Sequence, residues 1–439
     1  MNARLFAFSI AAAAAAAGYG LEVLNVTARP RWPWENVIDI DFEVSGGGEG
    51  EVYAVDVDAA YSNGTRKVAA STFLSEPIAA TGANRISWDM GKDAKDVTAD
   101  DLCVRVAVSP VSDDTPVYCV VDLSGGHTAE KWPVRYTLRA PEHVKGATGE
   151  PCQTTEMWFR RIPAKDRVFI MGYFRFRGEG TNYREYYAKL TNDYYISIFE
   201  TTQQQYYQMT GTWPSWFSNE TCRASRPVDS LIHADVRALS WPTDRDPGAG
   251  KPITIWRQKT GLATLDLPTE TQWEFCAQSD MNNGSREFWR YGNVADIARY
   301  KENNGGWVEK VSESNPAPYF CDLSKGTAPV GSYEPNKWGV YDLQGNVNEM
   351  TQDARSPNEG DTSAKAYYIA NGLGGTSVEN PVIDPAGPPR TWAGVTTGNH
   401  VTRGGCFKSG SDYNTYNFRD GQDWIRSRND GLRLVFTVK

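Results

Sequence analysis

Long polar and glycine-rich stretches without a periodic pattern are the feature that most constrains the fold of this chain. After about Met157 the sequence has short strand-like runs, two helix-like segments, and loops such as "MNNGSREFWRYGN" and "PNEGDTSAKAYYIANGLGGTSVENPVIDPAGPPR". Loops of that length inside a compact domain usually need bound ions, disulfides or dense aromatic packing to hold them. The 439 residues include 15 Trp, 22 Tyr and 40 Gly, a composition that suits a β-rich, loop-rich fold.

The region before this part has a different pattern. Alternating runs such as "VIDIDFEV", "EVYAVDVDA" and "CVRVAVS" are separated by the turn clusters "SGGGEG", "SNGT" and "SDDT". This alternation predicts an antiparallel β-sandwich (Ig-like) over residues 21–123. Residues 124–156 carry Gly, Pro and charge without periodicity and predict a linker, so residues 157–439 are expected to form the second domain.

The amino terminus reads "MNARLFAFSIAAAAAAAGYG", with one early Arg, an apolar run and then small residues. This pattern predicts a signal peptide over residues 1–20, and therefore a secreted, periplasmic or cell-surface protein. A membrane-spanning helix would need about 20 apolar residues, and no later stretch is long and apolar enough. The net charge of −9 and the lack of a Lys/Arg cluster exclude nucleic acid as a partner.

The seven cysteines of an exported chain permit disulfides. In "LCVRVAVSPVSDDTPVYCVV" two alternating runs flank a turn, so a hairpin would place Cys103 opposite Cys119. Either a cross-strand disulfide or two reduced core cysteines would fit this pattern. The four histidines are scattered without metal-type spacing, and a lone His such as His400 is more often structural than functional.

Two helices have clear start signals. In "YYISIFETTQQQYYQMT" a strand leads into a helix that Thr201 or Thr202 caps. In "PTETQWEFCAQ" Thr269 is the expected N-cap residue, and Gln272 three positions later closes a capping box. These two helices are the most regular elements expected after Met157.

Seven segments together resemble one known family. They are, in order, "FIMGYF", "YYISIFETTQQQYYQMTG", "RPVDSLIHADVRALSWP", "LDLPTETQWEFCAQ", "APVGSYEPNKWGVYDLQGNVNEMTQD", "VTRGGCF" and "NDGLRLVF". Their order and spacing resemble the formylglycine-generating enzyme (sulfatase-modifying factor) domain from about Met157 to Lys439. The resemblance implies an α+β fold class, with a C-type-lectin-like domain at the carboxyl terminus preceded by the antiparallel β-sandwich, as in secreted bacterial members.

The resemblance also implies a calcium site in the segment "DLQGNVNE". By position, the ligands would be the side chains of Asp342 and Glu349 and the backbone carbonyls of Gly345 and Val347. Hard oxygens at flexible angles are what Ca²⁺ prefers, and a glycine allows the backbone to bend inward. The alternative is an Asx-type turn in which Asp342 and Asn346 bond to nearby amides. A second calcium site of the family would meet Arg299 here, a residue unsuited to bind a cation.

The catalytic residues of the family are where this sequence departs from the pattern. The family's oxidases bind Cu(I) between two cysteine thiolates beyond an "RGGS" motif, but here those two positions fall on Ser409 and Asn414. Cys406 occupies the place of the family's serine. Because Cu(I) prefers soft thiolates, copper is not expected, and we assign no catalytic residue. A lone Cys406 without an evident base is expected to be buried or to form a disulfide.

These observations favour a secreted, calcium-stabilised binding or scaffold module, a pseudoenzyme of the family whose ligand is a peptide, protein or glycan. The alternatives are an oxidase that converts a sulfatase cysteine to formylglycine, and a different oxidative enzyme that uses the same pocket. Arginines recur with aspartates through the last forty residues, and we interpret them as an internally paired network rather than the rim of a binding groove.

Overall fold

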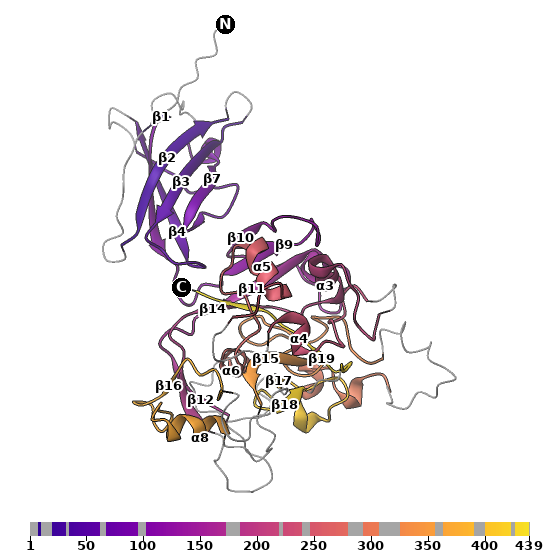
Figure 1. Cartoon of the computed structure of the whole chain (residues 1–439). Coiled ribbons are helices and arrows are strands. Elements are labelled where there is room, and N and C mark those ends of the chain that lie inside the picture. The colour runs from indigo at the N-terminus through magenta and orange to yellow at the C-terminus, as the bar shows by residue number, and fades with distance from the viewer. Residues whose placement is uncertain are drawn as a thin grey trace. The chain divides into compact units, whose positions relative to one another are not determined.

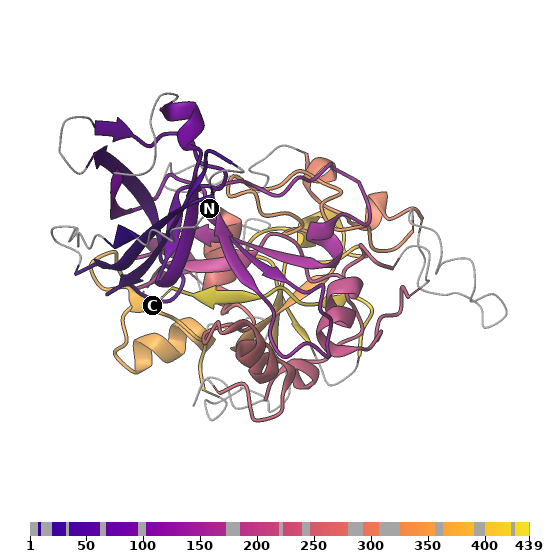
Figure 2. The same ribbon diagram turned by 90° about the horizontal axis from the view of Figure 1, so that it is seen from above.

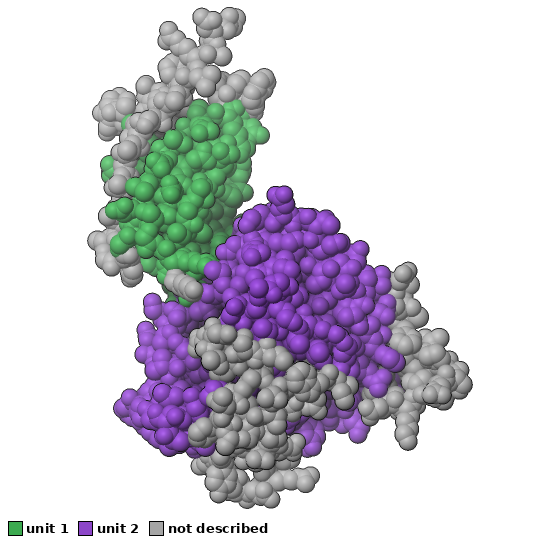
Figure 3. Space-filling model, viewed as in Figure 1, with its two compact units in different colours: residues 1–118, 136–140, 438–439 green, residues 119–135, 141–437 purple. Residues whose placement is uncertain are grey.

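The computed structural model describes residues 8–9, 20–31, 35–61, 67–94, 102–172, 185–218, 223–238, 246–279, 293–306, 325–355, 363–389, 400–422 and 426–438. The chain divides into two compact units, residues 1–118, 136–140 and 438–439, and residues 119–135 and 141–437 (Figure 3). Most of the predicted signal peptide lies outside the described residues. Within the described part of the chain, no helix has the length and apolar character needed to cross a membrane.

The first unit consists mainly of strands (Figure 1). Its elements are β1 (Phe8–Ser9), β2 (Glu22–Pro30), β3 (Ile38–Ser45), β4 (Val52–Tyr61), β5 (Lys67–Ala69), β6 (Ile78–Ala80), β7 (Gly82–Trp88), α1 (Met90–Asp93) and β8 (Leu102–Pro110). One sheet has the order β1-β2-β3-β7, and in the other β4 pairs with β5, β6 and β8. The pairings of β2 with β3, β3 with β7 and β4 with β8 are antiparallel.

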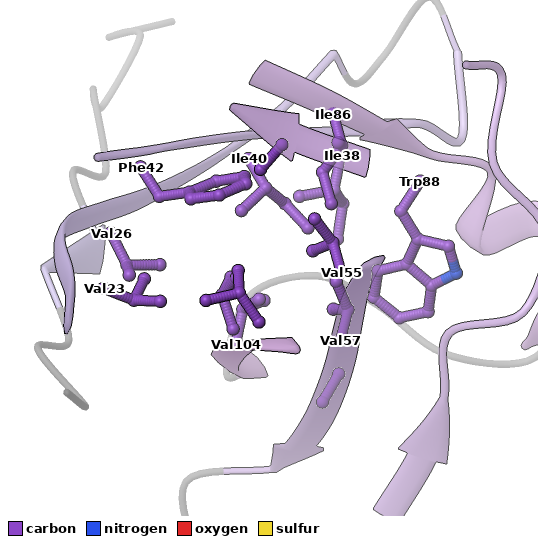
Figure 4. Close-up of a cluster of buried hydrophobic side chains, with 14 of the residues drawn as sticks. Val23, Val26, Ile38, Ile40, Phe42, Val55, Val57, Ile86, Trp88 and Val104 are labelled. Carbon is purple, nitrogen blue, oxygen red and sulfur yellow. The ribbon is translucent and has the colours of Figure 1, made fainter. Parts of the chain in front are cut away.

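The core of the first unit lies between these two sheets (Figure 4). Strand β3 buries Ile38, Ile40 and Phe42, which are alternate residues, and β4 buries Val55 and Val57 in the same way. Because successive side chains of a strand point to opposite faces, one face of each sheet is apolar. The alternation in the sequence therefore correctly predicted a sheet-rich amino-terminal region.

The second unit mixes short strands and helices joined by irregular segments (Figures 1 and 2). Its helices are α2 (Pro151–Thr154), α3 (Gln203–Thr210), α4 (His233–Val236), α5 (Pro252–Thr260), α6 (Glu270–Gln278), α7 (Val294–Ile297) and α8 (Ser363–Ala370), with the short 3-10 turns η3 (Lys301–Asn303) and η4 (Ser411–Tyr413). Its strands are β9 (Tyr118–Asp122), β10 (Val134–Thr137), β11 (Glu156–Ile162), β12 (Val168–Met171), β13 (Tyr186–Lys189), β14 (Tyr194–Ser197), β15 (Asn348–Ala354), β16 (Val382–Ile383), β17 (His400–Arg403), β18 (Arg419–Gln422), β19 (Asp430–Gly431) and β20 (Val435–Thr437). The division between the units falls within β9 and β10, since Tyr118 and residues 136–137 are grouped with the first unit.

Three sheets connect distant parts of this sequence. Their strand orders are β10-β9-β11-β14-β20, β12-β13-β16 and β18-β17-β15-β19. The last strand, β20, pairs antiparallel with β14, and β19 pairs in parallel with β15. The carboxyl-terminal strands are therefore held by strands from earlier in the chain. The region expected to be a linker, residues 124–156, contains β10 and α2.

The two predicted helix starts are confirmed. Thr202 is the N-cap residue of α3, and its hydroxyl accepts a hydrogen bond from the N–H of Gln205 at 3.1 Å. Thr269 is the N-cap residue of α6, with Gln272 completing the capping box. A polar side chain at the N-cap satisfies backbone donors that the first helical turn leaves unpaired.

The predicted hairpin between Cys103 and Cys119 does not form. Strand β8 pairs with β4, whereas β9 lies between β10 and β11 in another sheet. Both cysteines are free thiols, and Cys119 is buried. The local pattern predicted two strands correctly, but each strand finds its partner elsewhere in the chain.

Candidate functional site

The loop that leads into β15 has the sharp backbone turns that the sequence predicted. Asp342, Gly345 and Asn346 have φ angles of 58°, 80° and 59°, which place them in the left-handed region that disfavours most side chains. A Cβ atom on Gly345 would lie 2.3 Å from the backbone oxygen of Arg299. Glycine is therefore required at 345 both by its φ angle and by this close approach.

At three of the four positions predicted to bind calcium, hydrogen bonds that involve backbone N–H groups hold the loop in place. Asp342 Oδ2 accepts a hydrogen bond from the N–H of Gly331 at 2.7 Å. The N–H of Gly345 donates to the backbone oxygen of Gly404 at 2.9 Å. The N–H of Val347 donates to a buried carboxylate, that of Glu200, at 3.0 Å. The loop is thus anchored by its backbone as well as by its acidic side chains.

The fourth position, Glu349, is engaged by a cation of the protein itself. Its Oε1 accepts from Arg433 Nη2 at 2.6 Å, and its Oε2 accepts from Arg433 Nε at 2.8 Å and from Trp273 Nε1 at 2.7 Å. Both carboxylate oxygens are therefore occupied in a two-point pair with one guanidinium group. Among the described residues, Glu349 Oε1 accepts only this one bond, and a carboxylate oxygen has a second lone pair, so the calcium role of Glu349 stays a prediction in which the ion would share the carboxylate with Arg433.

The charges around this loop nevertheless leave a surplus of acid. Glu200, Asp342 and Glu349 are buried near one another, and Arg433 is the strong base that faces them. Burial raises the pKa of Asp342 to about 6. Burial, and then the charges of Asp342 and Glu349, raise the pKa of Glu200 well above its usual value. A cation bound here would relieve this repulsion, and the calcium site stays a prediction.

Ser409 and Asn414, the two positions predicted to correspond to the family's copper ligands, lie together in the turn after β17. Cys406 Sγ lies 3.2 Å from Ser409 Oγ, and Asn414 Nδ2 donates to the backbone oxygens of Ser409 at 3.0 Å and Gly410 at 2.9 Å. Cys406 is a buried free thiol packed against Phe407, and burial raises its pKa. One buried thiol, one hydroxyl and one amide do not fit Cu(I), which binds thiolates.

Ion pairs link helix α6 to strands β17 and β18. Arg403 contacts the carboxylates of Glu274 and Glu270, and Arg419 Nε donates to Glu270 Oε1 at 2.6 Å. Asp353 Oδ2 in turn accepts from the N–H of Glu270 at 2.7 Å. Burial, followed by the charge of Glu270, raises the pKa of Asp353 to about 7. The predicted internal pairing of the arginines is confirmed for these two residues, but their partners are glutamates of α6 and not neighbouring aspartates.

A cavity of about 40 Å³ adjoins this charged cluster, with Tyr186, Lys365 and Asn417 also in its lining. A space of that size suits ordered water, not a substrate. The cluster is therefore suited to hold α6 against the carboxyl-terminal strands.

A much larger groove, with a volume of about 450 Å³, is lined by other residues of α8. Its lining is apolar and aromatic for the most part: Tyr367, Tyr368, Leu373, Val382, Ile383, Asp384, Pro385, Ala386, Gly387 and Pro389. Leu373 and Ile383 are 48% and 53% exposed. Exposed apolar side chains gathered around a concave surface are typical of binding sites. No periodic pattern identified this groove, because it combines a helix, a short edge strand and a proline-rich turn.

Two histidines that are far apart in the sequence meet in the structure. His233 at the start of α4 and His400 at the start of β17 stack with ring centroids 3.4 Å apart and planes 7° from parallel. Both side chains are buried. The face-to-face arrangement does not aim both rings at a common ligand, so it supports the structural interpretation of His400.

The family model for the sulfatase-modifying factor enzyme 1-like domain matches residues 160–438. The second unit, which mixes sheets and helices, is therefore of the sulfatase-modifying factor class. Because the match covers more than half of the chain, the chain belongs to the formylglycine-generating-enzyme family.

Three relatives illustrate the range of this family. The chain is 26% identical over 210 residues to a "Chaperone protein LppX" of Paenibacillus barcinonensis, covering 43% of this chain and 71% of that protein. It is 31% identical over 192 residues to a formylglycine-generating enzyme of Streptomyces coelicolor, covering 41% of this chain and 51% of that enzyme. It is 33% identical over 146 residues to "Inactive C-alpha-formylglycine-generating enzyme 2" of Mus musculus, covering 33% and 40%. The chain thus spans about half or less of the two proteins named for formylglycine generation.

Proposed function

We propose that this protein is a catalytically silent member of the family that binds extended, apolar segments of polypeptide in the groove beside α8. The observation that carries the proposal is the groove itself, about 450 Å³ in volume and lined by half-exposed Leu373 and Ile383. Its size falls within the range of ligand-binding sites. The relative named as a chaperone supports a polypeptide ligand, and the relative named as inactive shows that the family includes proteins without the activity.

The argument for catalytic silence rests on donor chemistry. Ser409 and Asn414 stand at the positions of the thiolate ligands, and neither can supply the soft donor that Cu(I) requires. Cys406 is buried, and its pKa is raised by burial, which disfavours the thiolate. The alternatives are formylglycine formation on a sulfatase cysteine, and another oxidative reaction in the same pocket.

A binding experiment tests the groove. A fluorescently labelled, unstructured peptide rich in Leu and Phe is titrated with the full chain, and binding is followed by fluorescence anisotropy. Leu373→Glu and Ile383→Glu should each weaken binding by about ten-fold, or about 1.4 kcal/mol, because they place charge on the apolar lining. Val378→Glu is the matched control, since Val378 is 54% exposed but lies outside the lining. Equal effects of all three substitutions, or no binding by the unmodified protein, would refute the groove as the binding site.

A second experiment tests whether the protein lacks formylglycine-generating activity. The purified protein is incubated with Cu(I), oxygen and a Cys-x-Pro-x-Arg peptide, and mass spectrometry looks for the aldehyde product. We expect unchanged peptide. Appearance of formylglycine would establish the oxidase alternative in place of the binding module.

The remaining parts of the proposal concern fold type, calcium and export. A C-type-lectin-like second domain and an Ig-like first domain are consistent with the many irregular segments and the two antiparallel sheets, respectively. Calcium stabilisation is supported by the buried acidic surplus at Glu200, Asp342 and Glu349. Chelation should lower the melting temperature of the second unit, and Asp342→Ala should abolish that response; an unchanged transition on chelation would reject the calcium site. Export is supported by the leader-like first twenty residues and is tested by fractionation of the producing cells.

A further inference from the structure

Three side chains of different chemistry converge just before β11. His143, Glu150 and Cys152 each present a metal-binding atom, namely an imidazole nitrogen, a carboxylate oxygen and a thiol sulfur, and these atoms lie within 4.8 Å of one another. In the part of the chain that the structure describes, no other group of three such side chains meets this criterion. The sequence did not predict this site, because the spacing of seven and then two residues matches no common metal motif.

Hydrogen bonds outside the cluster fix how two of the groups are aimed. His143 Nε2 lies 3.1 Å from the backbone oxygen of Gly331, so Nε2 carries a proton and donates it there. The other ring nitrogen, Nδ1, faces Glu150 Oε2. Glu150 Oε1 accepts from the N–H of Val144 at 3.0 Å, which leaves Oε2 directed to the centre. Such outer contacts are what orient the ligands of metal sites.

The third group completes a partly enclosed pocket. Cys152 Sγ lies 3.9 Å from Glu150 Oε2 and 3.9 Å from the backbone oxygen of Glu142. The ring of His143 packs edge-on against Phe199 and Tyr341, with centroids 5.0 and 5.2 Å away. The side chain of His143 is 3% exposed and that of Glu150 is 17% exposed. An ion could therefore reach the cluster along Glu150, while the aromatic rings keep bulk water from the other side.

We propose that His143 Nδ1, Glu150 Oε2 and Cys152 Sγ bind one divalent transition-metal ion of the zinc class. Imidazole, carboxylate and thiolate are the ligands that Zn²⁺ takes, usually in a tetrahedron. Ligand atoms of such a tetrahedron are roughly 3.5 Å apart for metal–ligand bonds of about 2.0–2.3 Å. The 3.9 Å between Cys152 Sγ and Glu150 Oε2 is close to this value, whereas His143 Nδ1 and Glu150 Oε2, which are in direct hydrogen-bond contact, must separate by about 1 Å to admit the ion. The backbone oxygen of Glu142 or a water molecule supplies the fourth ligand. Binding releases two protons to solvent, the thiol proton of Cys152 and the proton that His143 Nδ1 and Glu150 Oε2 share in their hydrogen bond.

Two other interpretations of the cluster are weaker. A Cys–His catalytic pair would need a thiolate held by the imidazole, but here Glu150 is the partner of His143, and burial together with Glu150 raises the pKa of Cys152 to about 12. A purely structural hydrogen bond between His143 and Glu150 would not require the thiol. A metal ion accounts for all three groups. It would replace the thiol proton of Cys152, and the Glu150 carboxylate, whose charge disfavours a free thiolate, would bind the same ion.

The site would join two segments of the second unit. Gly331 accepts from His143 through its backbone oxygen, and its N–H donates to Asp342 in the loop of the predicted calcium site. A Cβ atom on Gly331 would lie 2.4 Å from His143 Nε2, so the histidine requires glycine there. Metal binding at His143 would thus stabilise the segment that precedes β11 together with the loop around residue 331, independently of any function of the groove.

Cobalt provides the test, because a thiolate bound to Co²⁺ gives a charge-transfer band in the near ultraviolet. The full chain is freed of metal with a chelator, returned to buffer with excess calcium, and titrated with Co²⁺. We expect one equivalent to produce the band, Zn²⁺ to remove it by displacement, and about two protons to be released per ion, one from the Cys152 thiol and one from the hydrogen bond between His143 and Glu150. The band should be absent in Cys152→Ser, and Glu150→Gln should weaken binding by at least about ten-fold.

Cys276→Ser is the matched control, because Cys276 is also buried with a pKa raised to about 12 but belongs to no such cluster. This variant should keep the band and the affinity of the unmodified protein. If Cys152→Ser does not fold, the affinity of Glu150→Gln for Co²⁺ decides whether the cluster binds the ion, since this variant keeps the thiol and removes only the charge of one ligand. No band in the unmodified protein, a band that survives in Cys152→Ser, or an affinity unchanged in Glu150→Gln would overturn the proposal.

Discussion

Replacement of Arg433 by Met tests whether buried charge pairing holds the second unit together. The side chains of Arg433 and Glu349 are 0% and 1% exposed, so neither end of the pair is solvated. Arg433 also donates to the backbone oxygens of Ser197 and Tyr341, each at 2.8 Å. The substitution would leave the buried carboxylate of Glu349 without its cation, and the backbone oxygens of Ser197 and Tyr341 would lose the hydrogen bonds that Arg433 donates.

The expected loss follows from these contacts. Removal of one partner of a buried ion pair costs about 3–5 kcal/mol, because the remaining charge stays buried. Methionine approximates the volume of the arginine stem, so little of the loss should come from a cavity. For a unit of this size the midpoint of thermal unfolding should fall by roughly 5–10 °C.

The assay is thermal and denaturant unfolding of the full chain, followed by tryptophan fluorescence. The control is Arg426→Met, because Arg426 pairs with Asp235 but its side chain is 53% exposed. Exposed pairs contribute about 0–1 kcal/mol, so this variant should unfold close to the original midpoint. If Arg433→Met lost no more stability than Arg426→Met, the pairing of Arg433 with Glu349 would not be a main support of the fold.

Two further predictions concern the same unit. The pKa of Asp353 is raised to about 7 in the folded state, so the folded protein binds more protons than the unfolded chain. This contribution to stability is present at acid pH and is lost as pH rises through about 7. Asp353→Asn should therefore flatten the plot of melting temperature against pH below about pH 7, and an unchanged slope would contradict the assignment of the raised pKa to Asp353. Gly345→Ala should lower the free energy of unfolding by at least about 2 kcal/mol more than Gly372→Ala. Both glycines have positive φ angles, of 80° and 66°, but only the Cβ atom at 345 would meet the backbone oxygen of Arg299. Equal losses in denaturant unfolding would show that the close contact relaxes at little cost.

Local sequence signals predicted the local structure well. Side chains of Thr202 and Thr269 cap helices where the capping patterns placed them, and alternation identified β3, β4 and β8. Gly345 has the positive φ angle that lets the backbone bend inward, and such an angle depends on the residue itself and its near neighbours. These features depend on neighbours in the sequence, so the sequence alone carries enough information to predict them.

Partners that lie far apart in the chain could not be predicted in this way. Glu349 pairs with Arg433 across 84 residues, and Glu274 meets Arg403 across 129 residues. The acidic residues at 270 and 274 lie one helical turn apart on α6 and could have indicated a charged face, but not which arginines would meet it. The Cys103–Cys119 hairpin failed for the same reason, because the pairing of a strand depends on the whole sheet.

The buried ion pairs stabilise the fold, and the residues that form them are not those predicted to carry the family's chemistry. Arg403 begins the sequence "RGG", which precedes the positions predicted to correspond to the family's thiolates, yet its guanidinium group is directed to Glu274 on α6 and to the backbone oxygen of Tyr416 at 3.0 Å. Its removal would leave Glu274 buried and unpaired whether or not a metal ever bound nearby. Ser409 and Asn414, at the positions that the resemblance assigns to the thiolates, carry no such cost, because Asn414 bonds to backbone oxygens of its own turn. Serine and asparagine at these two positions are therefore compatible with an intact fold, whereas a neutral residue at position 403 would cost stability.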